Sequence, residues 1–164
     1  KELTGFDACF FCLGGSSSRM TEEAYRQLTY GFTVAAGQTL SRLNPHMTMV
    51  FVSGEGTDET GKSRVMWARV KGEAENALRQ MPFKAAYMFR PGYIQPLDGI
   101  VSRERVYRYF YAVLAPFYPL WKILFPGMVT NTRFIGQAMI QVAKKGSAKT
   151  ILRSADINEA AAQK

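Results

Sequence analysis

The stretch from residue 47 to residue 92 constrains the fold most, because its hydrophobic pattern changes from strand to helix and back to strand. Residues 47–52 form a short, nearly continuous apolar run, which is typical of a strand buried on both faces in a parallel sheet. A glycine-rich polar loop follows, and apolar residues then recur at helical spacings over 64–78. Residues 85–89 form a second strand-like run. Two parallel strands joined by a helix predict a right-handed βαβ unit and an α/β fold.

The two strand-like runs end in loops that we expect to lie side by side. Ser53 follows the first run, and Arg90, Pro91 and Gly92 follow the second. In open α/β sheets, ligands bind beyond the carboxyl ends of the parallel strands. The sequence therefore predicts one crevice onto which both loops open.

Three motifs carry a resemblance to a known family. They are a strand ending in Val-Ser53-Gly, a helix carrying Trp67-Ala-Arg-Val-Lys71-Gly-Glu-Ala-Glu, and a strand ending in Phe-Arg-Pro-Gly-Tyr93. In this order and at this spacing, the chain resembles the second half of the extended and atypical short-chain dehydrogenase/reductases. Within them it looks most like the small NAD(P)-binding, sugar-nucleotide-epimerase-like proteins. The resemblance implies a single Rossmann-like domain over 1–164, with a three-layer parallel sheet, strand–helix repeats and C-terminal helices.

The resemblance also implies NAD or NADP as cofactor and an oxidoreductase or epimerase activity. In the family, a tyrosine lies four residues before a lysine, so that one helical turn puts both on the same face. The lysine holds the nicotinamide ribose and lowers the pKa of the tyrosine, which exchanges a proton with the substrate. Here Lys71 is the lysine, but Trp67 stands at the tyrosine position, and an indole N–H only donates. Lys71 is expected either to bind ribose or to be a solvated helix charge, and Trp67 to pack or stack.

This difference leaves the activity open. The active-site serine of the family falls on Ser53 or, one residue later, on Gly54. With Ser53 and Lys71 as the catalytic residues, the proton would have to come from Tyr87, Tyr93 or a residue on the substrate side. The alternative is a dinucleotide-sensing or scaffold protein that binds the cofactor and a protein partner without turnover.

The cofactor contacts that the resemblance implies come from three parts of the chain. Backbone after the apolar run 6–14 would approach the adenosine side, although a glycine pair here would also serve merely to turn a strand into a helix. The loop after 85–89 would line the nicotinamide end, or would simply end the strand in a turn. Residues 95–130 would form a variable substrate-side or cap segment. The expected cofactor contacts are Leu13, Gly14, Gly15, Ser53, Lys71, Arg90, Pro91 and Gly92.

The glycine-rich strand, turn and helix that begin the family's fold and bind the pyrophosphate have no counterpart in this sequence. We therefore expect the run 6–14 to be an apolar sheet edge that needs a second copy of the chain, a partner or a missing N-terminal half. The residue that separates NAD from NADP normally lies in the same region of the family, so the choice between them stays open.

Composition narrows the class of protein. Of 164 residues, 47% are apolar and 21% are charged, which are ordinary globular values, and the net charge of +8 comes from scattered basic residues. We expect a cytoplasmic protein with no signal peptide and no nucleic-acid face. His46 is the only histidine, which argues against Ser-His-Asp hydrolysis and against a multi-histidine metal site. Cys9 and Cys12 are expected to be separate thiols, because strand positions three apart point to opposite faces.

The most apolar region, 106–129, is too interrupted to cross a membrane. A span needs about 20 apolar residues, but Arg108 and Lys122 leave only residues 109–121 uncharged, and Pro116 and Pro119 lie within that stretch. Three roles for its aromatic residues stay open: burial or cover of the cleft, contact with another copy of the chain, or attachment to a bilayer surface.

Two further helices are predicted. Thr21, a capping residue followed by two acids, begins one whose apolar face extends to Leu43. Residues 132–146 form the other, which ends at a glycine and leads into a strand over 149–152. The tail, 156–164, is expected to fray.

Overall fold

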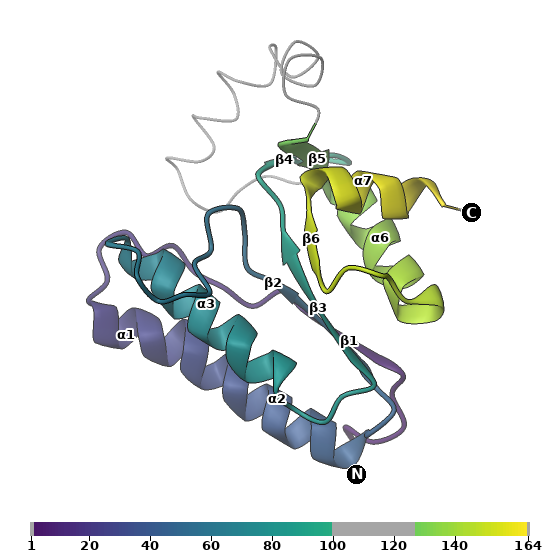
Figure 1. Cartoon of the computed structure of the whole chain (residues 1–164), viewed down its shortest axis with the longest axis horizontal. Coiled ribbons are helices and arrows are strands. Elements are labelled where there is room, and N and C mark those ends of the chain that lie inside the picture. The colour runs from purple at the N-terminus through teal and green to yellow at the C-terminus, as the bar shows by residue number, and fades with distance from the viewer. Residues whose placement is uncertain (1, 100–126, 164) are drawn as a thin grey trace.

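The computed structural model describes residues 2–99 and 127–163 (Figure 1). Most of the apolar region 106–129, and with it most of the expected cap segment 95–130, lies outside the described residues. The described part is built around a parallel sheet with helices on both faces. None of its helices is long and apolar enough to cross a membrane.

Four strands form the main sheet, in the order β1-β2-β3-β6, and every neighbouring pair is parallel. Their bounds are β1 Ala8–Phe11, β2 Thr48–Val52, β3 Ala85–Arg90 and β6 Ile151–Arg153. The helix α3, Met66–Arg79, connects β2 to β3. The predicted βαβ unit and the Rossmann-like α/β fold class are therefore confirmed.

The helices form two layers, one on each face of the sheet (Figure 1). On one face α3 packs against a long helical segment made of α1 (Glu22–Arg26), the π-helical turn η1 (Gln27–Gly31) and α2 (Phe32–Leu43). Thr21 caps this segment as predicted, since its hydroxyl accepts from the Ala24 N–H at 3.2 Å. On the other face lie α6 (Thr132–Lys145) and α7 (Ser154–Ala162).

Strand side chains alternate between the two helical layers, as the two-residue period of a strand requires. On the α3 side, the buried cluster contains Met49, Phe51, Ala74, Leu78 and Met88. On the α6 and α7 side, it contains Val50, Phe89, Ala138, Val142 and Ile157, among others. Both faces of β2 and β3 are thus covered, which explains why their sequences are continuous apolar runs.

The C-terminal tail is helical, and the expectation that it frays is wrong. Ile157 is fully buried and Ala160 is 9% exposed, because both pack into the cluster on the α6 side of the sheet. The carboxylate of Asp156 accepts from the Arg153 N–H at 3.0 Å and closes the first turn of α7. The three-residue spacing of Ile157 and Ala160 is typical of an amphipathic helix.

A second, smaller sheet extends the fold beyond the carboxyl end of β3. It pairs β4 (Tyr93–Gln95) with β5 (Val129–Asn131) in parallel. The side chain of Asn158 in α7 donates to the Val129 carbonyl at 2.9 Å, which ties this ribbon to the last helix. The loop that leaves β3 is therefore held in place on both sides.

Strand β1 is an edge of the described sheet, as the sequence predicts. Phe6 and Phe10 are 53% and 43% exposed, so the edge carries apolar surface. Cys9 and Cys12 beside them are free thiols. The expectation that another chain or segment covers this edge stays a prediction.

Candidate functional site

A cleft of about 500 Å³ lies at the carboxyl ends of β1, β2 and β3. Ser53 reaches it from the end of β2, Lys71 and Trp67 from α3, and Gly92 from the loop after β3. The two loops and the lysine therefore line one cleft, as the sequence predicts. Parallel strands all end at this edge of the sheet, which is where α/β sheets bind ligands.

A second hollow, of about 550 Å³, lies between α6 and α7 near the amino end of β6. Tyr87 lines it, and the Tyr87 hydroxyl accepts from the Ser147 N–H at 2.9 Å. This hollow contains no residue of the loops that follow β2 and β3. The first cleft is the stronger candidate, because only there do the predicted residues meet at the carboxyl ends of strands.

The loop after β1 contributes only part of the predicted backbone contact. Gly15 lines the cleft, together with Ser16 and Ser17. A Cβ on Gly15 would lie 2.9 Å from a side-chain carbon of Leu28, so this loop packs closely against the first helical segment. Leu13 and Gly14 are not among the residues that line the cleft, and half of Leu13 is exposed to solvent.

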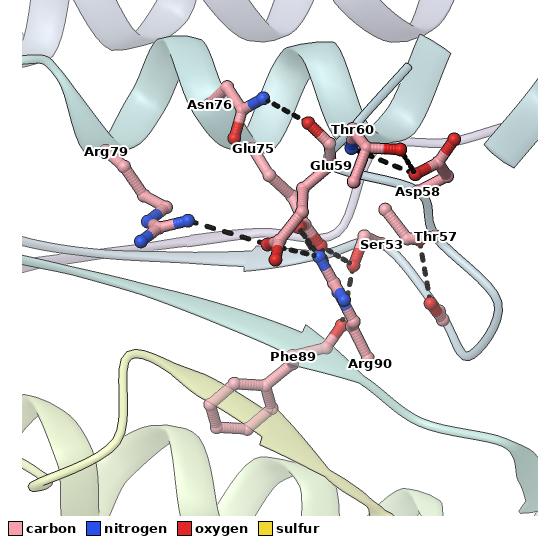
Figure 2. Close-up of polar contacts among 11 residues, drawn as sticks. Ser53, Thr57, Asp58, Glu59, Thr60, Glu75, Asn76, Arg79, Phe89 and Arg90 are labelled. Carbon is pink, nitrogen blue, oxygen red and sulfur yellow. Dashed lines mark hydrogen bonds and ion pairs between the residues drawn. The ribbon is translucent and has the colours of Figure 1, made fainter. Parts of the chain in front are cut away.

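Ser53 presents its carbonyl, rather than its hydroxyl, to Lys71. Its hydroxyl is buried and lies within hydrogen-bond distance of the Glu75 carboxylate and, at 3.2 Å, of the Phe89 carbonyl (Figure 2). A hydroxyl can donate only one hydrogen bond, and the charged Glu75 carboxylate is a stronger acceptor than the Phe89 carbonyl. The Ser53 carbonyl accepts a hydrogen bond from the Lys71 amine.

The Lys71 amine lies in the cleft rather than in open solvent. It donates to the Ser53 carbonyl and is 5.9 Å from the centre of the Trp67 ring. Burial lowers the pKa of this amine, and the charge of Glu75 acts in the opposite direction. An amine in this setting donates readily to a neutral hydroxyl-bearing ligand and gives up its proton more easily than a surface lysine.

Trp67 forms part of the cleft wall, one helical turn before Lys71. The loop after β2 packs onto it: a Cβ on Gly56 would lie 3.1 Å from the indole, and Gly56 has a φ of +84°. The indole therefore packs against this loop, and stacking on a ligand stays a prediction. It supplies no proton-transfer group at the position where the resembled family has a tyrosine.

Arg90 directs its side chain away from the cleft, into a buried ion pair (Figure 2). Its Nε donates to the two carboxylate oxygens of Glu75 at 3.0 and 3.2 Å, and its guanidinium also contacts Glu59 at 3.2 Å. The hydrogen bond to Glu75 is the main reason that the pKa of Arg90 is raised. Of the predicted group Arg90, Pro91 and Gly92, only Pro91 and Gly92 line the cleft.

The position of Gly92 has no room for a side chain. A Cβ there would lie 2.4 Å from the Met128 carbonyl oxygen. The Gly92 N–H donates to the hydroxyl of Ser154 at 2.9 Å, which fixes the loop against the start of α7. This close approach holds the cleft wall formed by the loop after β3.

The sequence did not predict several residues of the site, among them Tyr25 and Glu75. The other unpredicted residues of the cleft wall include Ser16, Ser17, Glu55 and Ile94. Tyr25, a buried residue of α1, lines the cleft, and nothing in its local pattern separates it from a core aromatic residue. Glu75 is completely buried behind the cleft, although it reads as one of several polar residues on α3. The sequence did contain a signal for Glu75, because it lies four residues after Lys71 and so shares the helical face of that lysine.

The chain matches no protein-family model and no curated protein sequence. The function of the cleft must therefore follow from its own chemistry. That chemistry is a half-buried amine, an indole ring, backbone carbonyls and closely packed glycines at the carboxyl ends of parallel strands.

Proposed function

We propose that this chain binds the nicotinamide and ribose part of NAD or NADP in the cleft, as a protein of the epimerase-like short-chain dehydrogenase/reductase type. The observation that carries the proposal is the Lys71 amine, which lies in the cleft together with Ser53 and Gly92. A ribose has neighbouring hydroxyls that accept from such an amine. Gly15 and Gly92 allow backbone to come close to a ligand, and Trp67 offers a flat apolar wall.

The cofactor, when bound, would supply a hydride to a substrate carbonyl or accept one from an alcohol. The chain's own part is to hold the ribose through Lys71 and to keep water from the ring with Trp67 and Ile94. The Leu13–Gly14 backbone lies outside the described cleft wall, so in this proposal the loop after β1 approaches the cofactor through Gly15.

Replacing Lys71 with methionine is expected to weaken NAD(P)H binding by about tenfold or more. Methionine keeps most of the side-chain length, so the change removes mainly one charge-assisted hydrogen bond, worth about 1.5–3 kcal/mol. Isothermal titration calorimetry with NADH and then NADPH measures the effect. Lys144→Met, at an exposed position of α6, is the control and should bind as the wild type does. Equal affinity for both variants, or no binding by the wild type at millimolar cofactor, would contradict the proposal.

A second function is favoured by Trp67: dinucleotide sensing or scaffolding without turnover. The two tyrosines considered as substitute proton donors do not line the cleft, since Tyr87 faces the other hollow and the Tyr93 hydroxyl donates to Gln95 at 2.8 Å. Among the described tyrosines, Tyr25 is the one in the cleft wall. An enzyme and a sensor therefore differ in whether a proton can be delivered to the substrate.

Oxidation of NAD(P)H against a panel of carbonyl compounds separates the two. Reduction moves a hydride to the carbonyl carbon and a proton to its oxygen. Trp67→Tyr places a phenol one turn before Lys71 and is expected to raise the rate about 100-fold where proton transfer is limiting. Trp67→Phe is the control, because it changes the ring without adding a proton donor. Wild-type turnover at least equal to that of Trp67→Tyr would favour the enzyme, and cofactor binding without turnover in the wild type would favour the sensor.

A further inference from the structure

A buried carboxylate lies directly behind the cleft, and we propose that Glu75 is a positioning residue for the Lys71 amine, acting through Ser53 and through its own charge. The proposal rests on the proposed function in that the Lys71 amine is taken as the ligand-binding group. It adds a residue that sets where this amine lies and how firmly it keeps its proton.

The geometry joins Glu75 to Lys71 through a single residue. Both side chains lie on the same face of α3, four residues apart. Ser53 contacts the two of them at once. Its hydroxyl donates to the Glu75 carboxylate (Figure 2). Its carbonyl accepts from the Lys71 amine. Ser53 therefore links the position of Glu75 to that of the acceptor of the Lys71 amine.

The charge of Glu75 calls for a functional explanation. A fully buried carboxylate is strongly unfavourable unless it is paired, and Arg90 pairs with it through more than one guanidinium nitrogen. Glu59 adds a second carboxylate to Arg90 at 3.2 Å. Buried ion pairs contribute little to stability compared with apolar residues of the same size. The arrangement instead keeps a charge at a defined place one turn after Lys71.

Charged and titratable groups line the cleft from several elements, and they differ in whether their charge acts on the Lys71 amine. Tyr25 lines the cleft from α1, and Glu55 lines it from the loop after β2. The Glu55 carboxylate pairs with Arg153 at 3.0 Å. Glu75 is the group whose charge opposes the effect of burial on the pKa of Lys71, and the positive charge of Arg90 lies behind it. Loss of the Glu75 charge therefore removes a favourable influence on the protonated amine and leaves the effect of burial unopposed by that charge.

The test follows the protonation of Lys71 through the reactivity of its free amine. Each lysine is acetylated with acetic anhydride at a series of pH values, and the rate at each site is read by peptide mass spectrometry. Glu75→Gln keeps the shape and an acceptor for the Ser53 hydroxyl but removes the charge. The pH midpoint of Lys71 labelling is expected to fall by about one unit, because an opposite charge close by is worth about that much. The exposed Lys144 serves as an internal control, and its midpoint should not change.

Ser53→Ala tests the path through the hydroxyl and removes only one buried atom. The midpoint of Lys71 is expected to fall by less than in Glu75→Gln, because the Ser53 carbonyl is then held less firmly toward the amine. Circular dichroism shows whether each variant is folded, and if Glu75→Gln is not, Ser53→Ala alone decides the question. A wild-type midpoint in the folded variants would overturn the proposal and leave Glu75 a purely structural residue. Because no cofactor is present in this experiment, its result is independent of whether the wild type binds NAD(P)H.

Discussion

Replacing Glu75 with alanine is expected to lower the free energy of unfolding by about 3–5 kcal/mol, because it breaks a buried ion pair and leaves the other partner in place. Arg90 is 5% exposed and would keep only its contact with Glu59, at 3.2 Å. The Ser53 hydroxyl, also buried, would lose its charged acceptor. Urea denaturation followed by circular dichroism measures the change.

Glu73→Ala is the matched control for this experiment. Glu73 lies on the same helix and pairs with Arg26, but the two side chains are 37% and 46% exposed. An exposed ion pair contributes about 1 kcal/mol or less. Similar losses for the two variants would mean that the Glu75 pair is not the buried support of the cleft that the structure indicates.

Replacing Gly72 with alanine is expected to destabilise the fold by about 1–3 kcal/mol and to weaken ligand binding at the same time. A Cβ on Gly72 would lie 1.8 Å from the Asp58 carbonyl oxygen and 2.4 Å from its carbon. These are backbone atoms, so the loop after β2 has to move. That loop is held to α3 by the hydrogen bond from the Asp58 N–H to the Ala68 carbonyl, at 3.0 Å. Its first residues, Gly54 and Glu55, line the cleft.

Gly136→Ala is the control for the glycine change. Gly136 lies within α6, and a Cβ there would meet no atom within 4 Å. Alanine is the better helix former by up to about 1 kcal/mol, so this variant should be neutral or more stable. Thermal unfolding of both variants gives the comparison. A Gly72→Ala protein as stable as the wild type would show that the loop after β2 is not clamped to α3.

The sequence was sufficient to predict the βαβ unit and the meeting of Ser53, Lys71 and Gly92, because strand and helix periods are local and parallel strands end at the same edge. It was also sufficient to place Trp67 beside Lys71, since residues four apart share a helical face. The likeness to a family supplied the expected chemistry of the cleft, which stays a proposal.

The sequence could not predict which buried side chains contact one another around the cleft, because these contacts join residues that are far apart in the chain. Arg90 was expected at the cofactor, and the structure directs its guanidinium to Glu75 and Glu59 instead. Tyr25 reaches the cleft from a helix that is distant in sequence. The tail was expected to fray, but Ile157 packs into the cluster on the α6 side of the sheet and is fully buried. Long-range packing decided each of these cases.

Binding of NAD(P)H beside Trp67 is the central claim, and the indole N–H resonance of Trp67 tests it most directly. Protein labelled with ¹⁵N contains two tryptophans, and Trp67→Phe identifies the resonance of Trp67. The account predicts that NADH or NADPH, added in millimolar excess, shifts this resonance in a saturable way. If neither cofactor moves the Trp67 resonance while the spectrum remains that of a folded protein, the cleft is not a dinucleotide site.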